Sequence, residues 1–213
     1  MKVLIIGSNG LLARTFIKEK SKNISKLYAT ASSSESINNI EINGDIETYS
    51  LSFKSRESIS SFFANQFEAL DLILFCASPF EGTLRESRFD GLDIWSNAYE
   101  VAIKVAKLAS DKLKPTGKLI YIGSVVGYQG QIAASCVPYS VFKGTLSLLV
   151  EGYNKEVSKQ AYYINLGGFR DIKSEEYLSV DEVVTNLGRV LDGDFVESHV
   201  NVVSEKDKMT YKL

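Results

Sequence analysis

Short runs of almost wholly apolar residues alternate along this chain with longer stretches of helical periodicity. Strands that are buried on both faces have this uninterrupted apolar character, which is typical of parallel sheets covered by helices. The alternation predicts an α/β fold, with a doubly wound parallel sheet of about seven strands and helices on both faces. The predicted strands are residues 2–6, 27–31, 70–76, 118–123, 162–166 and 200–203, with a weaker candidate at 40–42.

The stretches between these runs predict the helices. Residues 90–113 place apolar side chains on one face at helical spacing, and residues 138–159 begin at a proline that suits a first turn. A later helix is expected to begin after Ser179, which can form a capping box with Glu182, and to end near Gly193. Residues 32–39 are too few for a full crossover helix between the second and third strands. The length favours a single domain, residues 1–213.

The overall composition excludes several classes of function. The formal net charge is −2 with acidic and basic residues interspersed, so no basic face for nucleic acid is expected. No apolar run approaches the roughly 18 residues that cross a bilayer, and the N-terminus does not match a secretory signal. Cys76, Cys136 and His199 are too scattered for a zinc site, so no metal is expected. Reduced thiols and the unmatched signal favour a cytoplasmic location.

A glycine-rich turn follows the first predicted strand. Gly7 permits a tight turn off the strand, Gly10 lets the backbone approach a pyrophosphate, and the small Ala13 allows close packing of helix on sheet. The helix that follows presents free N–H groups and a partial positive charge to the phosphates. Glycines also occur in such turns for steric reasons alone. The position in the first strand–turn–helix unit of the fold favours dinucleotide binding.

The end of the second predicted strand bears on the choice of cofactor. An acidic residue there would bond the adenosine ribose of NAD, and its absence leaves room for the 2′-phosphate of NADP. Residues 28–34 contain no acid, and Ser32 and Ser33 can donate hydrogen bonds to a phosphate. Arg14 on the first predicted helix can add positive charge. The sequence therefore favours NADP(H), with NAD(H) possible, although the serines also suit a solvated turn.

Tyr139 and Lys143 lie one helical turn apart, on the same face of a predicted helix. A lysine ammonium next to a phenol stabilises the phenolate, which makes the phenol a proton donor near neutral pH. Such a pair can arise by chance in a chain rich in both residue types. Ser124, however, ends the preceding strand and faces the crevice where open α/β sheets bind ligands. Position and spacing together indicate a Ser–Tyr–Lys catalytic site.

The order of these motifs along nearly the whole chain resembles that of the short-chain dehydrogenase/reductases, which have a Rossmann-like fold. The Gly-x-x-Gly-x-x-Ala turn has the spacing of the family's extended and atypical branches. The resemblance implies that Asn97 supports a proton-relay water beside Lys143. It also implies that Asp45, after the third strand, meets the adenine amino group. Gly167 stands in the segment where the family has Pro-Gly beside the nicotinamide.

The resemblance extends the expected site to several strand ends. The family's Asn-Ala-Gly after the fourth strand is here Cys76-Ala77-Ser78, which loses an asparagine that normally braces the sheet. The expected catalytic residues are Ser124, Tyr139, Lys143 and Asn97. The expected cofactor-binding residues are Gly7, Ser8, Asn9, Gly10, Leu11, Leu12, Arg14, Ser32, Ser33, Asp45, Ile46, Cys76, Ala77, Ser78, Tyr139, Lys143, Gly167 and Phe169.

These features favour an NAD(P)(H)-dependent oxidoreductase that moves a hydride between a nicotinamide and a small-molecule carbonyl or alcohol substrate. One alternative is a nucleotide-sugar epimerase or dehydratase of the extended branch, which uses the same trio but needs a C-terminal sugar domain for which this chain leaves no room. The other is a binding protein that senses NAD(P) without turnover. In the resembled family the two long helices pair with symmetry mates, which implies a homodimer or homotetramer.

Overall fold

The computed structural model describes residues 1–32, 42–79, 92–127, 137–158, 160–170 and 177–204. Seven parallel strands form one sheet in the order β3-β2-β1-β4-β5-β6-β9, and two short strands pair separately beside it. The strands of the main sheet are β1 (Lys2–Ile6), β2 (Lys26–Ala31), β3 (Asp45–Ser50), β4 (Leu70–Phe75), β5 (Leu113–Ile122), β6 (Gln160–Leu166) and β9 (His199–Val202). The short pair is β7 (Phe169–Arg170) and β8 (Leu178–Ser179).

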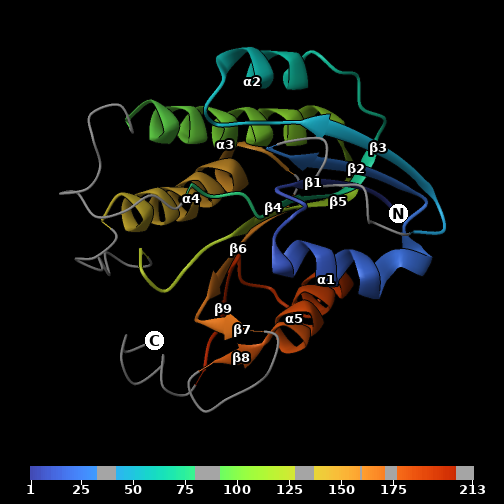
Figure 1. The fold of residues 1–213 in the computed structure, drawn as a ribbon. Helices are drawn as coiled ribbons and strands as arrows, with labels where there is room; N and C mark the ends of the chain where they lie inside the picture. Colours follow the sequence, from blue (N-terminus) through green and yellow to red (C-terminus); the bar gives the residue numbers. More distant parts are fainter. Residues whose placement is uncertain (33–41, 80–91, 128–136, 159, 171–176, 205–213) are drawn as a thin grey trace.

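Helices cover both faces of the sheet (Figure 1). One face carries α2 (Arg56–Phe63), α3 (Leu92–Lys112) and α4 (Val137–Glu156), and the other carries α1 (Leu11–Lys20) and α5 (Val180–Asp192). A single 3-10 turn, Ser21–Asn23, follows α1. This arrangement confirms the predicted doubly wound α/β sheet. No helix in the described ranges has the length and apolar character needed to span a membrane.

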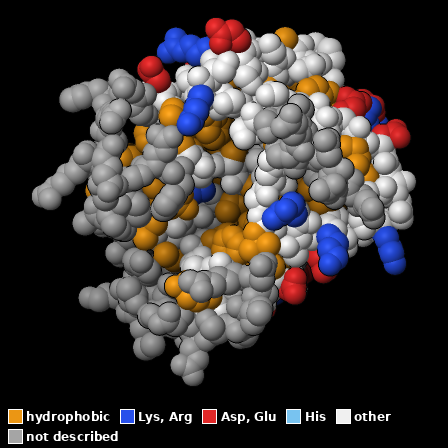
Figure 2. Space-filling model, viewed as in Figure 1, with side chains coloured by type: hydrophobic (Ala, Val, Ile, Leu, Met, Phe, Trp, Pro, Cys, Tyr) orange, Lys and Arg blue, Asp and Glu red, His pale blue; other side chains and the backbone are white. Residues whose placement is uncertain are grey.

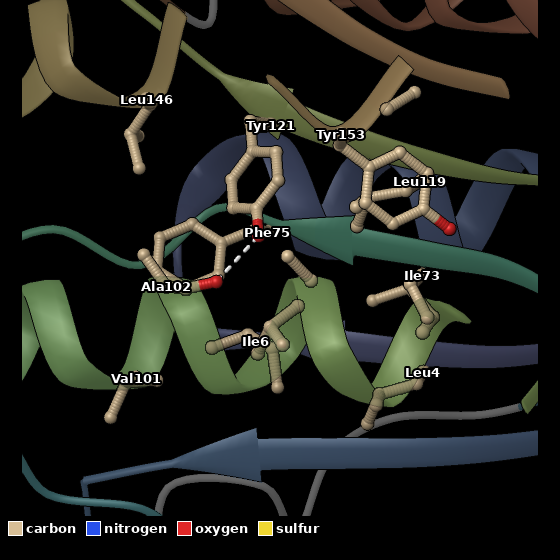
Figure 3. Packing of buried hydrophobic residues seen from close by; sticks show 14 of the residues in the cluster. Leu4, Ile6, Ile73, Phe75, Val101, Ala102, Leu119, Tyr121, Leu146 and Tyr153 are labelled. Atoms are coloured by element: carbon tan, nitrogen blue, oxygen red, sulfur yellow. Dashed lines mark hydrogen bonds between the residues drawn. The ribbon is translucent and has the colours of Figure 1, made fainter. Parts of the chain in front are cut away.

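The strand residues divide between two apolar layers, because successive side chains of a strand point to opposite faces. Leu4 and Ile6 of β1 face α3 and α4, whereas Val3 and Ile5 face α1 and α5. Figure 3 shows the first layer, where the side chains of the central strands face α3. Burial on both faces explains why the central strands lack polar alternation. The resulting continuous apolar runs are the feature from which the sequence predicts the central strands.

The third strand was predicted in the wrong place. It runs over Asp45–Ser50 instead of 40–42, and residues 33–41 lie outside the described part of the chain. β3 is an edge strand whose residues alternate between exposed and half-buried, so it has no continuous apolar run. A search for such runs therefore passes over it. As a consequence, Asp45 and Ile46 lie at the beginning of the strand, paired with Lys26 and Leu27.

The capping box of α5 is present as the sequence predicts. The Ser179 hydroxyl accepts a hydrogen bond from the Glu182 backbone N–H at 3.2 Å, and the Glu182 carboxylate accepts one from the Ser179 N–H at 3.0 Å. At the other end of the helix, Gly193 adopts the left-handed conformation with φ of 88°. Both ends of α5 were thus predicted from residues close to them in the sequence.

Replacing Ser179 by Ala is expected to lower the free energy of unfolding by about 1 kcal/mol, because an N–H at the first turn loses its acceptor. Urea denaturation of the native and variant proteins measures this difference. Thr185→Ala is the matched control in the same helix, since the exposed Thr185 hydroxyl only donates to the Asp181 carbonyl and caps nothing. Equal stability of the Ser179→Ala and Thr185→Ala variants would contradict the capping role.

Candidate active site

The site lies at the carboxyl ends of the central strands. β1 lies between β2 and β4 in the sheet, and the chain runs from β1 to β2 on one side before it returns to β4 on the other. Such a switch point opens a crevice between the strand ends. Two adjoining cavities of about 290 and 200 Å³ occupy it, and they share Gly10, Cys76 and Ser78 in their walls. Figure 2 shows apolar side chains gathered in a recess near the middle of the molecule. The two cavities together form one elongated cleft.

The glycine turn forms one wall of this cleft. Gly7 has a φ of +87°, and a Cβ there would lie 2.8 Å from the Ala77 backbone nitrogen. At Gly10, by contrast, the nearest described atom to such a Cβ is the Gly7 carbonyl oxygen at 3.8 Å. Gly7 therefore serves the turn itself, whereas Gly10 keeps the backbone open toward the cleft. Asn9, Leu11 and Leu12 complete this wall.

The N-terminus of α1 meets the same cleft. Gly10 is its N-cap residue and supplies no side-chain cap, and the first turn contains no acidic residue. The first N–H groups of α1 therefore keep their capacity to donate to an anion, with the helix dipole adding a partial positive charge. This geometry fits the pyrophosphate of a dinucleotide, as the sequence predicts.

Ser8 has a different role from the predicted contact with the cofactor. It is fully buried, and both its backbone N–H and its hydroxyl donate to the Thr30 carbonyl oxygen, at 2.8 and 2.7 Å. The Thr30 hydroxyl in turn accepts a hydrogen bond from the Gly7 N–H at 3.0 Å. These bonds fasten the glycine turn to the end of β2. Thr30 was missed from the sequence, although a lone hydroxyl residue at the end of an apolar strand was a usable signal.

The far end of the cleft differs most from prediction. Asp45 and Ile46 lie at the amino end of β3, away from the cleft, so their assignment to the adenine site is wrong. The residues that follow the strand, Leu51 and Phe53, line the cleft instead. The error follows from the misplaced strand, since only residues at a carboxyl end reach the crevice.

The residues proposed for the adenosine phosphate are only partly brought together. Ser32 follows β2 and lines the cleft, as predicted. Ser33 lies outside the described residues. Arg14 is exposed on α1 and lines neither cavity, so its predicted charge is not part of the cleft walls. Ala77 and Ser78, after β4, do line the cleft opposite the glycine turn.

Asn97 is almost completely buried on α3, and its side-chain amide donates to the Phe53 carbonyl oxygen at 2.7 Å. This bond anchors the segment after β3 that forms the far wall of the cleft. The Asn97 Oδ1 atom is buried without a hydrogen-bond partner among the described residues, which leaves one acceptor for a water molecule. The family resemblance implied a role beside Lys143, but Asn97 lines neither cavity of the cleft, and the sequence gave no sign of the contact with Phe53.

Ser124, Tyr139 and Lys143 line a single cavity together with Gly167 and Phe169. Ser124 follows β5, and Tyr139 and Lys143 lie in the first two turns of α4. The Lys143 ammonium lies 5.5 Å from the centre of the Tyr139 ring and donates to the Ile122 carbonyl oxygen at 2.7 Å. The structure therefore brings the three predicted catalytic residues together.

Burial controls the charge of two groups in this cavity. Lys143 is only 2% exposed, and desolvation lowers the pKa of its ammonium to about 8, with the Cys76 thiol opposing the shift slightly. The protonated form of Lys143 therefore still predominates at pH 7. Desolvation also raises the pKa of the half-buried Cys76 thiol to about 12, so Cys76 is a neutral part of the cleft wall.

Solved structures with this architecture are numerous. A short-chain dehydrogenase/reductase from Vibrio parahaemolyticus superposes with a TM-score of 0.74 and 16% identity over 95% of this chain and 99% of its own. A short-chain dehydrogenase from Burkholderia cenocepacia J2315 in complex with NADP gives 0.78 and 14% over 100% and 93%. The bulky-bulky ketone specific alcohol dehydrogenase from Comamonas testosteroni gives 0.77 and 15% over 94% and 86%. The chain has the short-chain dehydrogenase/reductase fold.

The likeness to these dehydrogenases is one of structure. No protein-family model and no curated protein matches the sequence itself. At 14–16% identity the likeness shows the fold alone. The chemistry of this particular chain has to be argued from its own side chains.

Proposed function

We propose that this protein is a short-chain dehydrogenase/reductase that uses NADP(H) to interconvert a small-molecule carbonyl and alcohol. The observation that carries the proposal is the continuity of the cleft. One cavity extends from the glycine turn to Leu51 and Phe53, and the adjoining one brings the uncapped N-terminus of α1 together with Ser124, Tyr139 and Lys143. The cavity that contains Ser124, Tyr139 and Lys143 would hold the nicotinamide end of a dinucleotide bound in this cleft.

The described residues fit such a cofactor. The turn from Gly7 to Leu12 and the N-terminus of α1 would hold the pyrophosphate, and Leu51 and Phe53 would flank the adenine. Ser32 would bond the adenosine ribose or its phosphate. Lys143 would hold the nicotinamide ribose, next to Gly167 and Phe169. When bound, the cofactor supplies or accepts the hydride at the substrate carbon.

The protein's own groups would then handle the proton. In reduction, Tyr139 donates its phenolic proton to the substrate oxygen as the carbonyl becomes an alcohol. The Ser124 hydroxyl donates a hydrogen bond to the same oxygen, which gains negative charge as the reaction proceeds. The Lys143 ammonium, 5.5 Å from the Tyr139 ring, stabilises the phenolate left behind. The reverse sequence oxidises an alcohol, with Tyr139 as the base.

A cofactor titration combined with a screen of carbonyl substrates tests this proposal. We expect saturable binding of NADPH and substrate-dependent loss of its absorbance. Binding without turnover of any ketone or aldehyde would instead support a protein that senses NAD(P). Conversion of a nucleotide sugar without net change in the cofactor would support an epimerase.

NADPH is expected to bind more tightly than NADH. Ser32, the described residue that follows β2 in the cleft wall, is a hydroxyl and not an acid, so no carboxylate there repels a 2′-phosphate. Fluorescence titration of both cofactors under the same salt conditions measures the preference. Ser32→Asp is expected to reverse it, because the new carboxylate would repel the phosphate and accept from the ribose. A clear preference of the native protein for NADH would refute the assignment.

The protein is expected to form a homodimer or homotetramer through α3 and α4. Ile103 on α3 and Val141 and Leu148 on α4 are 59%, 45% and 66% exposed, and contact with a second copy would remove these large apolar side chains from water. Leu148→Glu is expected to shift the protein toward monomer in light scattering at micromolar concentration. Val196→Glu is the control, since Val196 is fully exposed and belongs to neither helix. A native protein that scatters only as a monomer would rule this out.

A further inference from the structure

The end of β5, which carries Ser124, is held by a residue of the neighbouring strand. The Tyr163 hydroxyl, from β6, accepts a hydrogen bond from the Ser124 backbone N–H at 3.2 Å and donates one to the Ser124 carbonyl oxygen at 3.5 Å. We propose that Tyr163 is a positioning residue, whose hydroxyl sets the placement of Ser124 in the active site. The catalytic part of this inference rests on the proposed function.

The hydrogen-bond pattern of the sheet explains why Ser124 needs such a partner. Its neighbours Gly123 and Val125 donate their N–H groups to β6, to the carbonyl oxygens of Ile164 and Leu166 at 2.8 and 2.9 Å. Peptide groups alternate in direction along a strand, so those of Ser124 point away from β6, toward the side of β4. The pairing of β4 with β5 ends at Phe75 and Tyr121, short of residue 124. The Tyr163 hydroxyl therefore bonds the Ser124 peptide groups at a position where β4 no longer pairs with β5.

Gly123 is the reason that the tyrosine can reach this point. A Cβ at residue 123 would fall within the end of the Tyr163 ring, in contact with both Cζ and the hydroxyl oxygen. The absence of a side chain thus opens the path over the strand for the phenol. Because Gly123 immediately precedes Ser124, the hydrogen bond between Tyr163 and Ser124 depends on the glycine as well as on the tyrosine.

The Tyr163 ring is itself held in place. It is fully buried in the layer beneath α3 and α4, and it packs against the His199 ring with the centroids 5.6 Å apart. The His199 imidazole is bonded on one nitrogen to the Ser147 hydroxyl at 2.8 Å and on the other to Ser198 at 3.1 Å. A hydroxyl on a fully buried ring that packs against a hydrogen-bonded imidazole has few other positions to adopt. The Tyr163 hydroxyl can therefore restrict the motion of the Ser124 backbone.

The functional consequence concerns turnover and not cofactor affinity. The Ser124 side chain is proposed to bond the substrate oxygen, and such a bond contributes most when the donor is already in place as charge develops. Tyr163 lines neither of the two cavities of the cleft. Removal of its hydroxyl should loosen Ser124 while the walls that hold the dinucleotide stay as they are.

Tyr163→Phe tests the inference against Tyr162→Phe, a control on the next residue of the same strand. The Tyr162 ring is also buried, but on the opposite face of the sheet, and its hydroxyl donates to Gln160 at the start of β6. We expect backbone amide exchange at Ser124, followed by NMR, to become about tenfold faster in Tyr163→Phe and unchanged in Tyr162→Phe. The amide of Val125, bonded to Leu166, serves as the internal reference.

The kinetic arm uses the same two variants with NADPH and a carbonyl substrate that the native protein reduces. We expect kcat of Tyr163→Phe to fall by about tenfold, with the Kd for NADPH within about twofold of native. Tyr162→Phe should keep both values near native. A purely structural role for Tyr163 would change the stability of the fold without this separation of kcat from Kd.

The outcomes are distinguishable. Native exchange at Ser124 in Tyr163→Phe would overturn the inference, and so would faster exchange with an unchanged kcat. If the native protein binds NADPH but reduces no carbonyl, the proposed function fails and the catalytic part of the inference fails with it. In that case, the amide measurement still decides whether Tyr163 holds the end of β5.

Discussion

Tyr139→Phe is expected to lower kcat by about 10²–10⁴-fold while the Kd for NADPH stays within about twofold. The substitution keeps the aromatic ring in the cleft wall and removes only the proton that is transferred to the substrate oxygen. Stopped-flow or steady-state reduction of a carbonyl substrate, together with a cofactor titration, gives both quantities. Tyr99→Phe is the control: Tyr99 is half-buried on α3 against the Phe142 ring and lines neither cavity of the cleft.

The two other members of the trio should respond differently, which separates their roles. Lys143→Met is expected to weaken NADPH binding as well as turnover, because the ammonium is proposed to hold the ribose and to stabilise the Tyr139 phenolate. Ser124→Ala is expected to reduce turnover alone, since its hydroxyl bonds an oxygen whose charge develops in the transition state. Near-native reduction by Tyr139→Phe would show the mechanism to be wrong. Undisturbed cofactor binding in Lys143→Met would indicate a chance Tyr–Lys pair.

Gly7→Ala is expected to lower the free energy of unfolding by about 2–4 kcal/mol and to weaken NADPH binding by more than about tenfold. An alanine at residue 7 would have to keep a φ of +87° and place its Cβ 2.8 Å from the Ala77 backbone nitrogen. The turn would have to move away from β4, and the N-terminus of α1 would move with it. Urea denaturation and cofactor titration measure the two effects.

Gly152→Ala is the matched control for this substitution. Gly152 lies within α4, and an added Cβ would meet nothing within 4 Å. Alanine there should raise the free energy of unfolding by about 0.5–1 kcal/mol, because it restricts the unfolded chain more than glycine does. Cofactor affinity should stay the same. A Gly7→Ala protein with native stability and affinity would show that the turn tolerates a side chain, contrary to the geometry described above.

The core strands and the helix ends were predicted from the sequence because their signals are local. β1 was predicted at its observed bounds, since five consecutive residues carry the pattern of a strand buried on both faces. The capping box of α5 involves residues three apart. The glycine turn and the Tyr139–Lys143 pair also lie within one or two turns of chain. Their relation to strand ends then placed them in the crevice of an α/β sheet.

Several contacts of the site depended on residues far apart in the sequence. Ser8 bonds the end of β2 twenty-two residues later, Asn97 bonds the Phe53 carbonyl across 44 residues, and Tyr163 reaches Ser124 across 39. A serine in a turn, an asparagine in a helix and a tyrosine in an apolar strand each permit many partners. The choice among those partners is made only when the strands align in register.

Hydrophobic period and residue spacing act within a few turns of chain, so the amino-acid sequence was sufficient to predict the class of the fold and to suggest the proposed trio. The tertiary structure decided where the edge strand β3 runs, and therefore that Leu51 and Phe53 line the cleft while Asp45 lies at the far end of the strand. It also decided that the hydroxyl of a buried tyrosine holds Ser124. In β3 the residues alternate between exposed and half-buried, so this strand has no continuous apolar run, and a hydrogen bond between strands exists only after the sheet has formed.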